Sequence, residues 1–414
     1  MIAWQYLFRE MMSHKIRVIL IILAIAWGTT AITTMLAIGE GLRVTFGRAM
    51  QGVGQGLLIV SGGKTSRIFQ GTPLRQSIHL TQQDVDAIQQ SIPGIQAISG
   101  EFTFSAPLTY QGKSSFAVQK AVEPAYATIR NIRISPPGRF INPLDMEENR
   151  RVVVVGDEIV KRLFPASTNP LGKTILLGQW PFQVIGVTSH KLQISSYDGP
   201  DAYKIWIPAS TYSLLTRQRA YSDLIILPTD PAHTEALQRA IQTLIAVNHR
   251  ANPEDDRIVD FEDLYQTQQK STQLFLGMQI FLGIVGGLAL GIAGVGIANV
   301  MLVSISHATR DIGIQMAIGA TPQIIIVHYL TEALLMMLTG GLLGLVCTKL
   351  LITGISAIPI HSNILRFTGK PEPILSWNIF ITVLLVLSAV GLLSGIFPAR
   401  QAARIHPVEA LQHG

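Results

Sequence analysis

The sequence predicts a membrane α-helical protein with four transmembrane helices and a large α+β domain inserted between helices 1 and 2. Of its 414 residues, 48% are hydrophobic and only 14% are charged, a composition too apolar for an ordinary soluble protein. Long apolar runs able to cross a bilayer core of about 30 Å occur at residues 18–38, 274–305, 324–350 and 377–397. The stretch between the first two runs has mixed composition and is long enough for a folded domain.

The run at 274–305 organises the rest of the chain. It exceeds the roughly 20 helical residues that a bilayer needs, so we expect it to continue beyond the lipid as a stalk. The preceding residues 262–273 are polar and helix-compatible, which favours one continuous helix from the external domain into the membrane. Gly283, Gly287 and Gly291 form two successive GxxxG steps and predict close helix packing. The alternative is that small residues only thin an ordinary span.

Basic residues near the membrane ends indicate the orientation. Arg9, Lys15 and Arg17 precede the first run, Arg310 lies between the second and third, and Arg400 and Arg404 follow the fourth. The positive-inside rule then places both termini in the cytoplasm and the large domain outside. This distribution also explains the net charge of +6 without a nucleic-acid partner.

The predicted segments follow from these boundaries. In order they are a cytoplasmic amphipathic helix at 1–17, the first span at 18–38, the external domain at 39–272, the stalk and second span at 273–305, a cytoplasmic segment at 306–322, the third span at 323–350, an external loop at 351–376, the fourth span at 377–397 and a cytoplasmic tail at 398–414. A cleaved signal peptide is the alternative for the N-terminus, but its apolar run is too long for one.

Alternating and helical patterns predict an open α+β sheet in the external domain. Two βαβ-like units form its core at 45–118 and 216–262, and an inserted subdomain occupies 119–215. The predicted strands are 57–60, 95–106, 152–155, 174–177, 182–187, 203–207, 224–227 and 258–261, and the predicted helices are 81–91 and 231–248.

The sequence offers no catalytic, cofactor or metal site. Gly172-Lys173-Thr174 has the end of a phosphate-binding loop, but the loop's first glycine is missing and a strand is expected to follow. The histidines are scattered, and the single Cys347 falls in an apolar run. We therefore expect a chain that is not an enzyme and binds no cofactor.

Two polar residues fall within the third apolar run. Glu332 has His328 one helical turn before it. An intramembrane carboxylate suggests a proton or substrate contact. A buried hydrogen bond to a neighbouring helix is the simpler interpretation, and the sequence leaves both open.

The C-terminal part resembles the FtsX-like permease domain of the MacB-type (type VII) ABC transporters. The resemblance rests on residues 296–304, 310–321, 332–335 and 395–411, which read GIANVMLVS, RDIGIQMAIGAT, EALL and GIFPARQAARIHPVEAL. The external domain is similar to the family's periplasmic core at residues 153–156, 163–164, 169–173 and 182–187.

The resemblance implies a permease subunit of an ABC-type export system in the bacterial inner membrane. A separate cytoplasmic ATPase would move the periplasmic domain through the stalk, in a dimer of two permeases of one or two kinds. The resemblance also implies three further partners: a periplasmic adaptor protein, a TolC-like outer-membrane channel and membrane lipid. The implied ATPase-coupling residues are Arg310, Asp311, Gly313, Ala317, Gly319 and Ala320. His307, Gln315 and Met316 stand where the family usually has charged residues, which suggests a dedicated ATPase.

Two other functions remain open within the same family. One is the release of lipoproteins from the membrane, and the other is mechanical regulation of a cell-wall hydrolase without transport. The transported substrate is not encoded in any pattern of the sequence.

Overall fold

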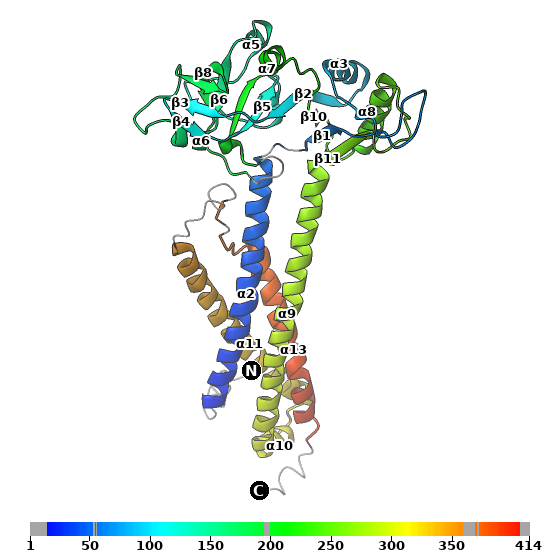
Figure 1. Cartoon of the computed structure of the whole chain (residues 1–414). Helices are drawn as coiled ribbons and strands as arrows, with labels where there is room; N and C mark the ends of the chain where they lie inside the picture. Colours follow the sequence, from blue (N-terminus) through cyan, green and yellow to red (C-terminus); the bar gives the residue numbers. More distant parts are fainter. Residues whose placement is uncertain are drawn as a thin grey trace. The chain divides into compact units, whose positions relative to one another are not determined.

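The structure, a computed structural model, describes residues 15–52, 54, 56–193, 199–358, 369–370 and 372–405. These residues form two compact units, a helical unit (15–44, 273–358 and 372–405) and a sheet unit (45–272 with 369–370) (Figure 1). Residues 1–14 of the predicted amphipathic helix, 359–368 of the predicted loop and 406–414 of the predicted tail lie outside the described residues.

Four long helices carry the predicted spans. They are α2 (Lys15–Gln51), α9 (Leu264–His307), α11 (Pro322–Ala357) and α13 (Trp377–Ala402). Each is long and apolar enough to cross a membrane, which confirms the prediction of four transmembrane helices. The helices extend past the apolar runs because the polar residues at their ends do not break a helix. The short helix α10 (Thr309–Ala317) separates α9 from α11.

Close approaches at glycines give the relative directions of α2 and α9. Gly28 of α2 contacts Leu290, Ile32 contacts Gly286, and Gly39 contacts Gln279. Residue numbers fall along α9 as they rise along α2, so the two helices are antiparallel. Gln279 Nε2 also donates to Glu40 Oε2 at 3.1 Å.

The other two helices pack in the same way. Gly340 and Gly344 of α11 lie against Ile25 and Thr29 of α2, so these helices are parallel. Leu387, Gly391 and Gly395 of α13 lie against Gly341, Met337 and Ala333 of α11 in reverse order. The four helices therefore alternate in direction, and α10, the start of α2 and the end of α13 lie at the same end of the unit.

The sheet unit is built on an 11-stranded mixed sheet in the order β11-β1-β10-β2-β5-β9-β6-β8-β7-β3-β4. Its strands are β1 (Leu58–Gly62), β2 (Ile95–Phe104), β3 (Leu108–Tyr110), β4 (Lys113–Ser115), β5 (Val118–Val122), β6 (Val152–Val155), β7 (Thr174–Leu177), β8 (Trp180–Val187), β9 (Lys204–Pro208), β10 (Asp223–Pro228) and β11 (Val259–Asp263). Neighbours are antiparallel except for the pairs β5–β9 and β6–β8. The helices of the unit are α3 (Gln82–Ser91), α4 (Tyr126–Ile129), α5 (Pro143–Glu147), α6 (Asp157–Leu163), η1 (Asp201–Tyr203), α7 (Ala209–Thr216) and α8 (Glu235–Asn248).

Both faces of this sheet are covered, which explains its apolar runs. Along β6, Val153 and Val155 enter one buried cluster while Val154 enters another. Successive strand residues point to opposite faces, so a strand buried on both sides must be apolar throughout. On one face lie two clusters side by side, one under α6 and α7 and one under α3 and α8; the other face packs on α4.

The predicted strands and helices of the domain are each matched by an element of the structure, with ends displaced by a few residues. The short strands β3, β4 and β5 and the short helices α4 to α7 were not predicted, because brief elements carry little periodic signal. The division into a core and an inserted subdomain stays a prediction. Strands of both parts join one sheet, and β3 from the predicted core pairs with β7 from the predicted insert.

Candidate functional site

Helix α9 begins directly after an edge strand of the sheet. Its first residue, Leu264, is buried and donates its backbone N–H to Leu57 O at 2.9 Å. Asp263 ends β11 and caps the helix, since its Oδ1 accepts from Gln266 N at 3.0 Å. Its Oδ2 accepts from Thr234 Oγ1 at 2.5 Å, just before α8. The start of α9 is thus tied to three elements of the sheet unit, and the helix then continues without interruption to His307.

A defined turn ends α10. Gly319 has a φ of +106°, its N–H donates to Met316 O at 3.2 Å, and Ala320 N donates to Gln315 O at 2.9 Å. This pair of hydrogen bonds is the Schellman motif, which terminates a helix at a residue that L side chains fit poorly. Thr321 and Pro322 then start α11. The predicted glycine turn is confirmed, and a reason for glycine at 319 is apparent.

The predicted coupling residues divide between two sides of this segment. Arg310, Asp311, Ala317 and Gly319 are exposed, whereas Gly313 is buried and Ala320 is half-buried against the helical core. Two isoleucines that the sequence analysis did not single out share the exposed side, Ile314 at 42% and Ile318 at 82% exposure. We call Arg310, Asp311, Ile314, Ala317 and Ile318 the α10 surface. The sequence contained a signal for this apolar surface, because two isoleucines four residues apart lie on the same helix face, next to the charged residues.

The glycine row predicted for helix packing faces away from the rest of this chain. A Cβ at Gly283, Gly287 or Gly291 would have no neighbour within 4 Å among the described atoms. The glycines used within the chain are Gly286 and Gly294, which approach Ile32 and Ser394. Packing of the predicted row against a second chain stays a prediction.

His328 and Glu332 lie on successive turns of α11. Glu332 is only 5% exposed, beside Tyr329 and Ala333 of the helical core. The His328 ring meets the Tyr329 ring edge to face, with 5.3 Å between centroids. The carboxylate therefore points into the helix bundle, a position that fits both a structural contact and a functional one.

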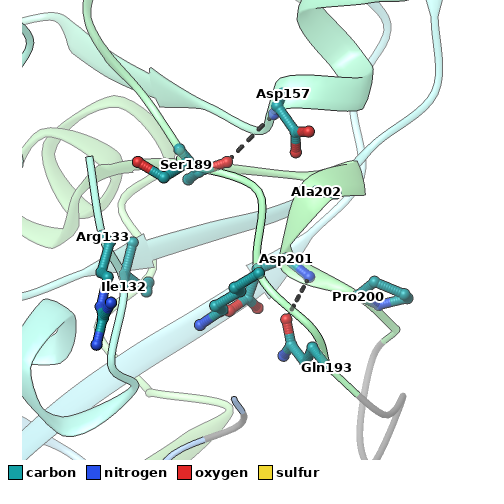
Figure 2. Close-up of a pocket in the computed structure, with 10 residues that line it drawn as sticks. Ile132, Arg133, Asp157, Ser189, Gln193, Pro200, Asp201 and Ala202 are labelled. Carbon is teal, nitrogen blue, oxygen red and sulfur yellow. Dashed lines mark hydrogen bonds and ion pairs between the residues drawn. The ribbon is translucent and has the colours of Figure 1, made fainter. Parts of the chain in front are cut away.

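A buried ion network in the sheet unit was not predicted. Asp201 is 3% exposed and contacts three cations: its Oδ2 is 2.8 Å from Lys191 Nζ, and its Oδ1 is 3.3 Å from Arg130 Nη2 and 3.4 Å from Lys204 Nζ. Gln193 Oε1 accepts from Asp201 N at 3.0 Å, and Figure 2 shows this bond at the edge of a small cavity. That cavity holds about 10 Å³, room for a single water.

Burial and charge act in opposite senses on these groups. Burial raises the pKa of Asp201, but the charges of Arg130, Lys204 and Lys191 outweigh it and hold that pKa well below its ordinary value. Burial lowers the pKa of Lys204 to about 8, although Asp201 raises it. Lys120, fully buried, pairs with Glu101 at 2.7 Å. The lysine at 204, at the start of an otherwise apolar strand, was a signal for this network in the sequence.

Among the described residues, neither the Gly-Lys-Thr segment nor any acidic, His or Cys cluster has the features of a nucleotide or metal site. Gly172 lies in a turn that leads into strand β7, as predicted, so no helix N-terminus follows the Gly-Lys-Thr segment. Within the described ranges, no group of three or more His, Cys, Asp or Glu residues could hold a metal ion.

Two protein family models match successive parts of the chain. Residues 18–244, more than half of the chain, match the MacB-like periplasmic core domain, and residues 283–407 match the FtsX-like permease C-terminal domain. The class is thus a multi-pass membrane permease with a periplasmic domain between its first two helices. The chain belongs to the MacB-type permease family.

Curated relatives align with nearly the whole chain. The "Macrolide export ATP-binding/permease protein MacB" of Bordetella avium is 29% identical over 402 residues, with 97% of this chain and 58% of that protein covered. The "Probable syringafactin export ATP-binding/permease protein SyfD" of Pseudomonas syringae pv. tomato is 29% identical over 403 residues, covering 97% and 57%. The chain therefore spans somewhat more than half the length of these relatives. The crystal structure of the periplasmic region of MacB from Actinobacillus actinomycetemcomitans is 20% identical with a TM-score of 0.43, covering 54% of this chain and 95% of that one.

Proposed function

We propose that this chain is the permease subunit of an ABC-type export system that works by mechanical transmission. A cytoplasmic ATPase binds the α10 surface, and its closure on ATP moves the periplasmic domain through α9. The 414 residues contain no nucleotide-binding loop, so the chain itself is not the enzyme and hydrolysis falls to an ATPase outside them. The names of the relatives, which specify export and ATP binding, support this proposal.

The observation that carries the proposal is the continuity of α9. One helix runs from the Asp263 cap at the end of strand β11 to His307, two residues before α10 begins. A helix with no proline and no break transmits displacement along its axis better than a loop, which absorbs it.

The α10 surface is suited to a protein partner. Ile318 and Ile314 expose apolar area at the end of the helical unit where α2 begins and α13 ends, beside Arg310 and Asp311. An apolar centre with charges at its edge is the usual anatomy of a protein interface. The positive-inside rule supports a cytoplasmic location for this end.

The proposed assembly has further partners. A second permease would pack along Gly283, Gly287 and Gly291, and a periplasmic adaptor with a TolC-like outer-membrane channel would complete a tripartite pump. The proposed location is the bacterial inner membrane with both termini in the cytoplasm.

The first test identifies the partners. The tagged chain is purified from native membranes in mild detergent, and co-purifying proteins are identified by mass spectrometry. We expect an ABC ATPase in the wild-type eluate and its loss in Ile318→Asp, because a carboxylate would be placed in the apolar centre of the interface. Ile68→Asp, at an isoleucine 72% exposed in the sheet unit, is the matched control. Absence of any ATPase from the wild-type eluate contradicts the proposal.

The second test addresses transmission through α9. Two glycines inserted between Lys270 and Ser271 should abolish ATP-dependent distance changes between labels in two periplasmic domains, while the ATPase stays bound. Seven helix-forming residues inserted at the same place nearly restore the helical phase, at about 3.6 residues per turn, and should retain those changes. Equal effects of the two insertions would argue against a mechanical role for α9.

A further inference from the structure

The sheet unit's packed face has a cavity of about 530 Å³ between α3 and α7. It lies over β2, where the buried cluster under α6 and α7 meets the one under α3 and α8. Tyr221 packs against both clusters. We call this the seam cavity; its volume is in the range that small-molecule sites occupy.

Aromatic rings form the floor of the seam cavity. The Phe102 and Tyr221 rings lie 4.6 Å apart between centroids, and Tyr212 packs on Phe102 at 5.1 Å. The Tyr221 ring covers Gly100 so closely that a Cβ there would overlap it. The floor is therefore held in place from behind. The two rings are tilted by 40° and Phe102 is only 2% exposed, so the half-buried Tyr221 ring is the part of the floor on which an aromatic ring can stack.

Most polar groups of the walls are already engaged within the chain. Thr81 Oγ1 donates to Asp84 Oδ2 at 3.0 Å, Ser210 Oγ to Met146 O at 2.7 Å, and Ser213 Oγ to Gln218 O at 2.7 Å. These bonds fix the frame of the cavity and leave little capacity for a highly hydroxylated ligand.

Two lining side chains remain available, on opposite walls. Gln83 projects from the first turn of α3 and Arg219 from the loop after α7, and both are exposed. Within the described part of the chain, neither makes a hydrogen bond or ion pair to another residue. Arg219 is the one charged residue of the lining. Tyr221 OH donates to Gln82 Oε1 at 2.5 Å and lies 3.1 Å from Glu123 Oε1, so it too is engaged within the chain.

We propose that the seam cavity binds a small amphiphile that combines a planar aromatic body with one anionic group, a carboxylate or sulfonate. The ring stacks on Tyr221, the anion pairs with Arg219, and Gln83 donates from the facing wall. This binding requires neither an ATPase nor an adaptor, so it can be tested independently of the transport proposal.

Photolabelling of the full chain in lipid nanodiscs tests the site. The probe is 4-benzoylbenzoate, whose benzophenone inserts readily into methionine C–H bonds, and Met146 lines the cavity. We expect saturable labelling of the peptide that contains Met146, competed by naphthalene-2-sulfonate. Arg219→Gln should raise the half-saturating concentration by about tenfold, the loss of one charge-assisted pair. The neutral amide of the probe should bind the wild type more weakly by a similar factor.

Matched controls separate this cavity from general binding. Arg162→Gln removes another exposed arginine, in a different groove, and should leave labelling within about twofold. Gln83→Trp fills the cavity mouth and should abolish labelling, whereas Gln89→Trp, exposed on α3 outside the lining, should not. Labelling confined to the transmembrane helices, equal labelling by the neutral amide, or no effect of Arg219→Gln would each overturn the proposal.

Discussion

Gly286 of α9 packs directly against Ile32 of α2, so closely that a Cβ at 286 would overlap the isoleucine side chain. A Cβ at the next residue, Gly287, would lie in open space. Adjacent glycines thus have opposite roles, one inside the helical unit and one on its surface. Small residues permit such backbone approach in membrane helices, where no hydrophobic drive holds helices together.

This contrast predicts opposite effects of the same substitution. Gly286→Ala should destabilise the helical unit by about 1–3 kcal/mol, because the added methyl group overpacks the contact with Ile32. Gly287→Ala should be neutral or stabilise by about 0.4–1 kcal/mol, because alanine restricts the unfolded chain without a clash. Thermal unfolding of both variants in the same detergent measures the difference, and equal shifts would contradict the assigned contact.

A bulkier residue at 287 probes the proposed dimer. Gly287→Leu should leave the unfolding temperature of the chain nearly unchanged, since no described atom of another segment lies within 4 Å of the added Cβ. It should reduce cross-linking between two copies, or between this chain and a second permease, because leucine prevents close backbone approach. Unchanged cross-linking in a folded variant removes the glycine row from the interface.

Removal of Asp201 should destabilise the sheet unit in a pH-dependent way. Asp201→Asn takes the carboxylate from three cations, and breaking a buried ion network costs about 3–5 kcal/mol. Burial lowers the pKa of Lys204 to about 8 even with Asp201 present; without it the pKa falls further. Lys204 is then neutral at high pH, so the loss at pH 9 should be smaller than at pH 7 by about 1 kcal/mol.

The wild-type protein provides the reference for that comparison. The folded-state pKa of Lys204, about 8, lies below its ordinary value of 10.5, so the unfolding free energy of the wild type also rises with pH between these values. Unfolding is therefore compared between variant and wild type at each pH. Asp230→Asn, at an exposed carboxylate, should leave the unfolding free energy nearly unchanged at both pH values. A loss for Asp201→Asn that is independent of pH would contradict the role assigned to Lys204.

The turn after α10 should depend on glycine at 319. Gly319→Val places a β-branched residue at a φ of +106°, which costs on the order of 1–2 kcal/mol and should open the last turn. Hydrogen exchange at the amides of Gly319 and Ala320, which donate to Met316 and Gln315, should accelerate about tenfold or more. Ile318→Val, next to it but at a negative φ, is the control and should retain protection.

Prediction from the sequence was most successful where one hydrophobic periodicity or one composition dominated a segment. The four spans followed from apolar length alone, and α9 followed from the absence of any break between 262 and 305. In the sheet unit, Val152–Val155 was recognisable as a strand because β-branched residues in succession indicate burial on both faces. The brief strands β3 and β4 had no such signal.

The candidate sites were less accessible to sequence reasoning. The α10 segment was found by resemblance, but only the structure separates its exposed residues, Arg310, Asp311 and Ala317, from the buried Gly313. The ion network around Asp201 joins residues from 130 to 204, and the seam cavity joins residues from 81 to 221. No local pattern reports which distant side chains will meet.

The sequence by itself determined the number of spans, the place of the large domain and the continuity of α9, because each depends on local hydrophobicity and helix propensity. The tertiary structure alone decided which glycines pack within the chain, which lysines are buried beside Asp201, and that Phe102, Tyr221 and Arg219 border one cavity. Those outcomes depend on strand order and helix rotation, which long-range packing sets after the local elements have formed.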